Sequence, residues 1–88
     1  KEDKNVIFKE MALFKIVGNS LKTKKAINSC KKFNPVILDK TKNSIVIQIT
    51  ALRRDIDKMA KNLRSLGLIS ISRTGAVAMT RGADIFNN

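Results

Sequence analysis

Histidine, tryptophan and tyrosine are absent from this 88-residue chain, and it has a single cysteine, Cys30. Without histidine, neither a Ser-His-Asp arrangement nor a Cys–His pair can be assembled, so the common forms of nucleophilic catalysis are excluded. A lone cysteine excludes an internal disulfide and is typical of a reducing compartment. The only aromatic residues are four Phe, so we expect a core of Ile, Leu, Val, Ala and Met.

Acidic residues are also scarce, because seven Asp and Glu stand against 18 Lys and Arg, giving a net charge of +11. Such a surplus favours an acidic partner: a nucleic acid, an anionic membrane surface or a negatively charged protein. Most of the basic residues are Lys, so the surplus also fits a solvated surface that serves solubility alone. The four glycines are too scattered for a phosphate-binding loop, and no apolar run is long enough to span a membrane.

Hydrophobic periodicity predicts four strands and two helices in a single domain. In chain order they are a strand over Met11–Val17, a helix over Leu21–Phe33, strands over Val36–Asp39 and Ile45–Thr50, a helix over Arg53–Leu66 and a strand over Leu68–Arg73. This β-α-β-β-α-β order is typical of the α+β ferredoxin-like fold, a four-stranded antiparallel sheet with two helices on one face. The expected domain covers residues 8–82, after a linker or disordered segment at 1–7 and before a tail at 83–88.

Two helices on one side leave the other face of the predicted sheet uncovered. Strand residues alternate between the faces, so some members of an apolar set must point away from the helices: Ala12, Phe14, Val46 and Ile69. An apolar uncovered face normally packs against a second sheet or domain. The pattern therefore predicts association, most simply a homodimer through the open sheet face.

The segment Leu68–Gly82 is the most distinctive stretch of the sequence. It begins as a strand, breaks at a glycine and continues as a second extended piece of small apolar residues. The candidate partner-docking residues in it are Arg73, Thr74, Gly75, Arg81 and Gly82. Its two arginines are either anchors for a carboxylate or phosphate on a partner, or exposed charges at strand ends.

The remaining reactive side chains do not form a site. Cys30 lies on the apolar stripe of the first predicted helix and is expected to behave as a small buried hydrophobe. Asp55 and Asp57 are two residues apart on the second helix and point in different directions, so we expect solvated charges rather than a metal site. Asp57 is placed to pair with Lys61 at i,i+4. No catalytic, cofactor-binding or metal-binding residue is predicted.

RNA or another polyanion is the alternative partner. Sheets of this topology that bind RNA present aromatic residues for stacking on their central strands. Here only Phe8 and Phe14 are available, and the lysines of the first helix would add salt-sensitive, non-specific affinity.

Three stretches resemble the C-terminal domain of the small, regulatory subunit of acetohydroxyacid synthase (acetolactate synthase). The segment Ile71–Gly82, ISRTGAVAMTRG, resembles the "ARTG…ALARG" ending of that family. Upstream, Glu10–Ile16 (EMALFKI) is similar to its "ELALIKV" strand, and Asp39 with Asn43–Thr50 (NSIVIQIT) is similar to its "D…ESLTIEVTG" hairpin. The resemblance spans about residues 9–82.

The resemblance implies a non-catalytic domain, without a cofactor of its own, that docks on and helps activate a thiamine-diphosphate-dependent catalytic subunit. That enzyme acts in branched-chain amino-acid biosynthesis, in the cytoplasm or, in photosynthetic eukaryotes, in the plastid. Family members sense valine through an N-terminal ACT domain that this sequence does not include, so we expect no complete valine site here. The sequence departs from the family at Ala51–Arg54, where an N-cap and acidic residues are replaced by ALRR, and in its lysine-rich first helix.

Overall fold

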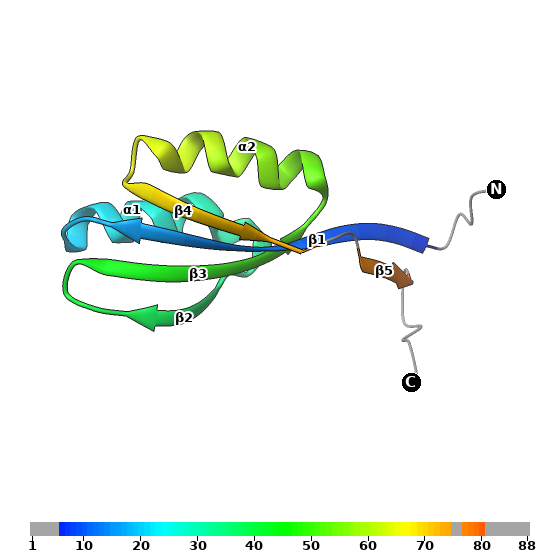
Figure 1. Ribbon diagram of the computed structural model, residues 1–88, viewed down its shortest axis with the longest axis horizontal. Coiled ribbons are helices and arrows are strands. Elements are labelled where there is room, and N and C mark those ends of the chain that lie inside the picture. The colour runs from blue at the N-terminus through cyan, green and yellow to red at the C-terminus, as the bar shows by residue number, and fades with distance from the viewer. Residues whose placement is uncertain (1–5, 75–76, 81–88) are drawn as a thin grey trace.

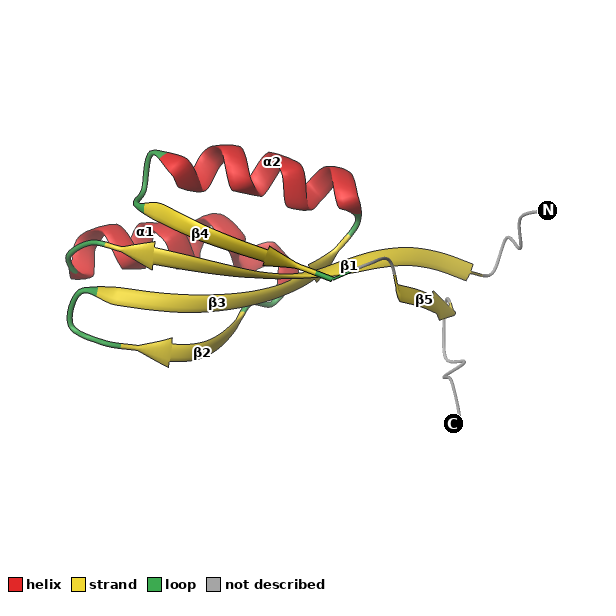
Figure 2. Ribbon diagram, viewed as in Figure 1, coloured by secondary structure: helices red, strands yellow, loops and turns green. Residues whose placement is uncertain are grey.

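The computed structural model describes residues 6–74 and 77–80. Its elements in chain order are β1 (Val6–Val17), α1 (Ser20–Cys30), a short 3₁₀ helix η1 (Lys31–Phe33), β2 (Val36–Lys40), β3 (Ser44–Ala51), α2 (Arg53–Arg64), β4 (Leu68–Arg73) and β5 (Val77–Thr80). The main sheet is antiparallel in the order β2-β3-β1-β4, and both helices cover one face of it (Figures 1 and 2). The predicted ferredoxin-like fold is confirmed.

The first strand is longer than predicted. Periodicity placed it at Met11–Val17, whereas β1 starts at Val6. Residues Val6–Lys9 pair with β5, outside the reach of β3 and β4, and form a two-stranded projection that we call the ribbon (Figure 1). A short strand can be recruited by a partner far away in sequence, which a local pattern does not reveal.

Alternation along the strands gives the sheet a covered face and an open face. Register places Phe14 beside Ile47 of β3 and Ile71 of β4 on the covered face. The fully buried side chains of the core are Ala12, Phe14, Ile16, Ala26, Cys30, Ile45, Ile47, Ile56 and Leu63. We define the open face by the outward residues Met11, Leu13, Lys15 and Val17 of β1, Val36 and Asp39 of β2, Ser44, Val46, Gln48 and Thr50 of β3, and Ser70 and Ser72 of β4.

The apolar strand residues divide between the two faces, as alternation requires. Ala12 and Phe14 are buried beneath the helices, Val46 is half-buried on the open face, and Ile69 is 63% exposed. The helices also follow their predicted stripes, because Ala26 and Cys30 of α1 are buried. Burial raises the pKa of the Cys30 thiol to about 11, which agrees with the prediction of an unreactive core residue.

The two helices start and end differently. Asn19 caps α1, since its Oδ1 accepts a hydrogen bond from the Lys22 amide at 3.0 Å, whereas Leu52 at the start of α2 provides no side-chain cap. The predicted helix over Leu21–Phe33 is shorter as an α-helix, because its last turn tightens into η1. After α2, Gly67 has φ +99° and a Cβ there would lie 2.2 Å from the Val17 carbonyl oxygen. A glycine is therefore required at this turn.

No helix in the described ranges combines the length and the apolar character that crossing a membrane requires.

Candidate partner-docking site

The predicted docking segment includes β4 and β5, which both pair with β1. Thr74, directly after β4, is held by the backbone of Met11: the Thr74 amide donates to the Met11 carbonyl at 2.9 Å, and the Met11 amide donates to Thr74 Oγ1 at 3.2 Å. Gly75, Arg81 and Gly82 lie outside the described residues, so their predicted role stays a prediction. Of the five predicted docking residues, Arg73 and Thr74 lie in the described part of the chain.

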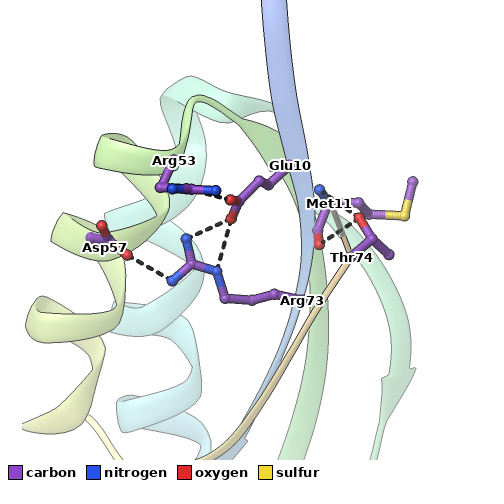
Figure 3. A network of polar contacts seen from close by, with 6 residues as sticks. All are labelled: Glu10, Met11, Arg53, Asp57, Arg73 and Thr74. Carbon is purple, nitrogen blue, oxygen red and sulfur yellow. Dashed lines mark hydrogen bonds and ion pairs between the residues drawn. The ribbon is translucent and has the colours of Figure 1, made fainter. Parts of the chain in front are cut away.

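Arg73 contacts two carboxylates of its own chain. Its Nε and Nη2 donate to Glu10 Oε1 at 2.9 and 2.5 Å, and its Nη1 donates to Asp57 Oδ1 at 2.6 Å. Figure 3 shows the guanidinium between β1 and α2, pointing to the side of the helices. The three contacts tie β4 to β1 and to α2, and they use all three nitrogens of the fork.

Glu10 is the centre of this network. Its side chain is only 7% exposed, and its second oxygen, Oε2, accepts from Arg53 Nε at 2.8 Å (Figure 3). Hydrogen bonds from Arg53 and then from Arg73 lower the pKa of the Glu10 carboxyl below its ordinary 4.5. The two carboxylates in turn raise the pKa of Arg73. A buried carboxylate with two guanidinium partners is a stable arrangement because its charge is fully compensated.

The ion pairs around Arg73 show that the predicted Asp57–Lys61 pair was wrong, and they reveal Glu10 as a residue of the site that was not predicted. Asp57 was expected to pair with Lys61 one turn along the helix, but its carboxylate binds Arg73 instead. The tertiary contact is with a guanidinium that is 28% exposed, so it is better shielded from water than a lysine on the outer face of α2. Glu10 was not singled out in the sequence. The sequence could have identified it, because Glu10 alternates in step with Ala12, Phe14 and Ile16. This alternation places its carboxylate on the covered face of the sheet.

The network lies where the ribbon meets the main sheet. Glu10 pairs with the last residue of β3, and the preceding Lys9 pairs with Val77 of β5. The last residue of β4, Arg73, pairs with Ala12, and the following Thr74 bonds to Met11, so both lie close to Glu10 along β1. The contacts of Glu10, Arg73 and Thr74 therefore hold the end of β4 against β1, at the start of the predicted docking residues.

Asp55 and Asp57 of α2 were expected to be solvated charges. Asp55 is half-buried and Asp57 is occupied by Arg73. Within residues 6–74 and 77–80, no group of three or more Cys, Asp or Glu side chains is placed to hold a metal ion.

Known proteins provide close matches over nearly the whole chain. A family model described as the small subunit of acetolactate synthase matches residues 9–82. The acetolactate synthase small subunit of Bacillus subtilis (strain 168) is 31% identical over 81 residues, covering 91% of this chain and 46% of that protein. The small subunit of Mycolicibacterium smegmatis is 23% identical over 82 residues, covering 93% of this chain and 48% of the relative.

A solved structure agrees with these matches. The crystal structure of the acetolactate synthase small subunit from Thermotoga maritima superposes with a TM-score of 0.74 at 27% identity, covering 92% of this chain and 50% of that one. The chain thus spans about half the length of the relatives it matches. The matched range includes the whole ferredoxin-like sheet and the segment that leaves it, which confirms the resemblance seen in the motifs. The chain belongs to the family of acetolactate synthase small subunits.

Proposed function

We propose that this chain is a non-catalytic, regulatory domain that docks on the catalytic subunit of acetolactate synthase and helps activate it. The observation that carries this proposal is the family match over residues 9–82. The thiamine-diphosphate chemistry of acetolactate formation belongs to the catalytic subunit, in branched-chain amino-acid biosynthesis. This chain contributes a folded docking surface, and the complex lies in the cytoplasm or, in a photosynthetic eukaryote, in the plastid.

The direct test mixes the chain with its cognate catalytic subunit and measures the rate of acetolactate formation. We expect the two to co-sediment and the rate to rise as the chain is added. A Phe14→Asp variant is the matched control, because a charge in the core prevents folding while the basic surface charge is retained. Absence of both binding and stimulation by the folded chain would contradict the proposal.

The segment that starts at Arg73 is the proposed contact to the catalytic subunit, and it includes Gly75, Arg81 and Gly82. In this proposal Arg73 and Thr74 act as positioning residues, since the Arg73 guanidinium is already bound to Glu10 and Asp57. Two variants separate positioning from direct contact. If Arg73 positions the segment, Arg73→Ala and Glu10→Gln weaken binding of the catalytic subunit similarly. If only Arg73→Ala weakens binding of the catalytic subunit and Glu10→Gln does not, the guanidinium contacts the partner directly.

The open face is the proposed homodimer interface. Its centre is aliphatic, with Leu13 and Val46 half-buried, and Met11 and Val17 are 36% and 40% exposed. Among the described residues of the main sheet, its charged side chains are Lys15 of β1 and Asp39 of β2, which have opposite sign. A second copy that packs there would bury this surface, and apolar burial stabilises by roughly 25 cal/mol per Å².

Sedimentation equilibrium tests the dimer. We expect a concentration-dependent dimer that Leu13→Asp converts to a monomer, whereas Leu21→Asp leaves it unchanged. Leu21 is the matched control because it is 60% exposed on α1, on the other side of the molecule. A monomer at all concentrations, or equal effects of both variants, would contradict this interface.

Binding of RNA through the sheet receives no support from the aromatic residues. Phe14, one of the two candidates, is fully buried under the helices and is unavailable for stacking. Phe8 is 62% exposed, but it lies on the ribbon. Fluorescence anisotropy with an RNA oligonucleotide at about 150 mM salt should therefore show weak, salt-sensitive binding.

A further inference from the structure

Most of the positive charge of the molecule lies on one layer. We call α1, η1 and α2 together the helix layer. It carries ten basic side chains, all exposed: Lys22, Lys24, Lys25, Lys31, Lys32, Arg53, Arg54, Lys58, Lys61 and Arg64. Against them stand two acidic residues, Asp55 and Asp57, which leaves a formal +8 of the total +11 on this layer.

The acidic groups within residues 6–74 neutralise little of this charge. Asp57 is paired with Arg73 of the sheet, and Glu10 is shared between Arg73 and Arg53. Asp55 is half-buried and lines a small hollow between the helices together with Lys32 and Lys58. No acidic residue occurs anywhere in α1 or η1. The outer surface of the layer is therefore left with uncompensated cations.

The cations are arranged in rows. Arg54, Lys58 and Lys61 are spaced i, i+4 and i+7 on α2, so they share one outer stripe and repel each other. Lys24 of α1 and Lys31 of η1 are seven residues apart, across the end of that helix. An anionic surface placed against these rows would relieve the repulsion as well as attract the charges.

We infer that the helix layer extends the contact with the catalytic subunit beyond the segment that starts at Arg73, which adjoins α2 through Asp57, and that the layer fits an acidic patch on that partner; the inference rests on the proposed function. Charge complementarity selects this occupant, because the open face carries one cation and one carboxylate, Lys15 and Asp39, and suits a largely apolar contact with a second copy. A protein is favoured over a nucleic acid because the layer has one aromatic residue, the half-buried Phe33, and so lacks a stacking platform.

A pair of charge-reversal variants tests this assignment. Lys58→Glu/Lys61→Glu changes the stripe of α2, and Lys40→Glu/Lys42→Glu makes the same change of net charge on the hairpin between β2 and β3. All four lysines are exposed, so both variants should fold. The affinity of the catalytic subunit for the chain is measured by isothermal titration calorimetry at about 50 and about 300 mM salt. The Debye length is markedly shorter at the higher concentration, so attraction between charges is weaker there.

We expect the helix-layer variant to bind about tenfold or more weakly at low salt and the hairpin variant to stay within about twofold, since opposed charges contribute strongly at a complementary interface. The affinity of the unmodified chain should fall as salt is raised. Equal binding by both variants would overturn the inference while leaving the proposed docking intact. Failure of the unmodified chain to bind would remove both. Tighter binding of a single-stranded RNA than of the catalytic subunit at about 150 mM salt would also overturn it, with nucleic acid as the occupant.

Discussion

The covered face of the sheet is closed by helices of the same chain, whereas the open face presents half-buried aliphatic residues to solvent. On the covered side Phe14, Ile16 and Ile47 are fully buried. On the other side their neighbours Leu13 and Val46 are half-buried, among serine, threonine and glutamine. The same strands therefore supply the core on one face and an uncovered, partly aliphatic surface on the other, and ten of the basic side chains lie on the helices.

The largest expected effect is the difference in stability lost when a side chain is truncated on the covered face or on the open face. Phe14→Ala removes a fully buried ring from the core and should lower the free energy of unfolding by about 3–5 kcal/mol, a large part of the stability of a small domain. Leu13→Ala, its neighbour on the open face, should cost about 1 kcal/mol or less in the monomer, because a half-exposed side chain leaves no closed cavity. Urea denaturation at low protein concentration measures both. Equal losses would show that the open face is as much a part of the monomer core as the covered one.

The next effect concerns the charged network on the covered face. Because the pKa of Glu10 is lowered in the folded state, its contribution to stability is complete above its ordinary 4.5 and is lost as pH falls through the lower, folded-state value. Glu10→Gln should lower Tm by several degrees at neutral pH and reduce the loss of Tm between neutral and acid pH. Thermal unfolding followed by circular dichroism from neutral pH to about pH 3 measures this.

Asp57→Asn is the matched control for that experiment. Asp57 also binds Arg73, but its side chain is 56% exposed, so the pair should contribute about 1 kcal/mol or less. An equal drop in Tm for both variants would show that the buried Glu10–Arg73 pair stabilises the fold no more than the exposed Asp57–Arg73 pair.

The smallest effect compares the starts of the two helices. Asn19 caps α1, and Asn19→Ala should cost about 1 kcal/mol of unfolding free energy. Leu52 leaves α2 uncapped although its backbone is extended, as a cap requires, so Leu52→Asp should add about 0.5–1 kcal/mol. Chemical denaturation of the two variants gives both values. Destabilisation by Leu52→Asp would mean that the half-buried leucine contributes more through packing than an N-cap would.

The parts of the fold that were predictable are those in which the pattern is local. The strand expected at Ile45–Thr50 is β3 from Ser44 to Ala51, because its buried residues alternate with a period of two. The helix expected from Arg53 starts at that residue, and its apolar stripe of Ile56, Met59 and Leu63 is buried. A turn that demands a positive φ is equally local, so Gly67 was placed correctly.

The parts that were missed depend on contacts between distant segments. The start of β1 at Val6 depends on β5, which lies more than 60 residues later in the sequence. The partner of Asp57 is Arg73 rather than Lys61, since the turn at Gly67 brings β4 beside α2. The sequence placed Arg73 among the candidate site residues, but its role between two carboxylates follows only from the folded arrangement (Figure 3).

Lysine footprinting of the complex tests directly whether the helix layer meets the catalytic subunit, because lysines occur both on that layer and on the hairpin between β2 and β3. Each lysine is labelled with an amine-reactive reagent, with and without the catalytic subunit, and quantified by mass spectrometry. We expect Lys24, Lys58 and Lys61 of the helix layer to lose reactivity when the catalytic subunit binds, while Lys40 and Lys42 on the hairpin keep theirs. Protection of the hairpin lysines with the helix layer still reactive would contradict it.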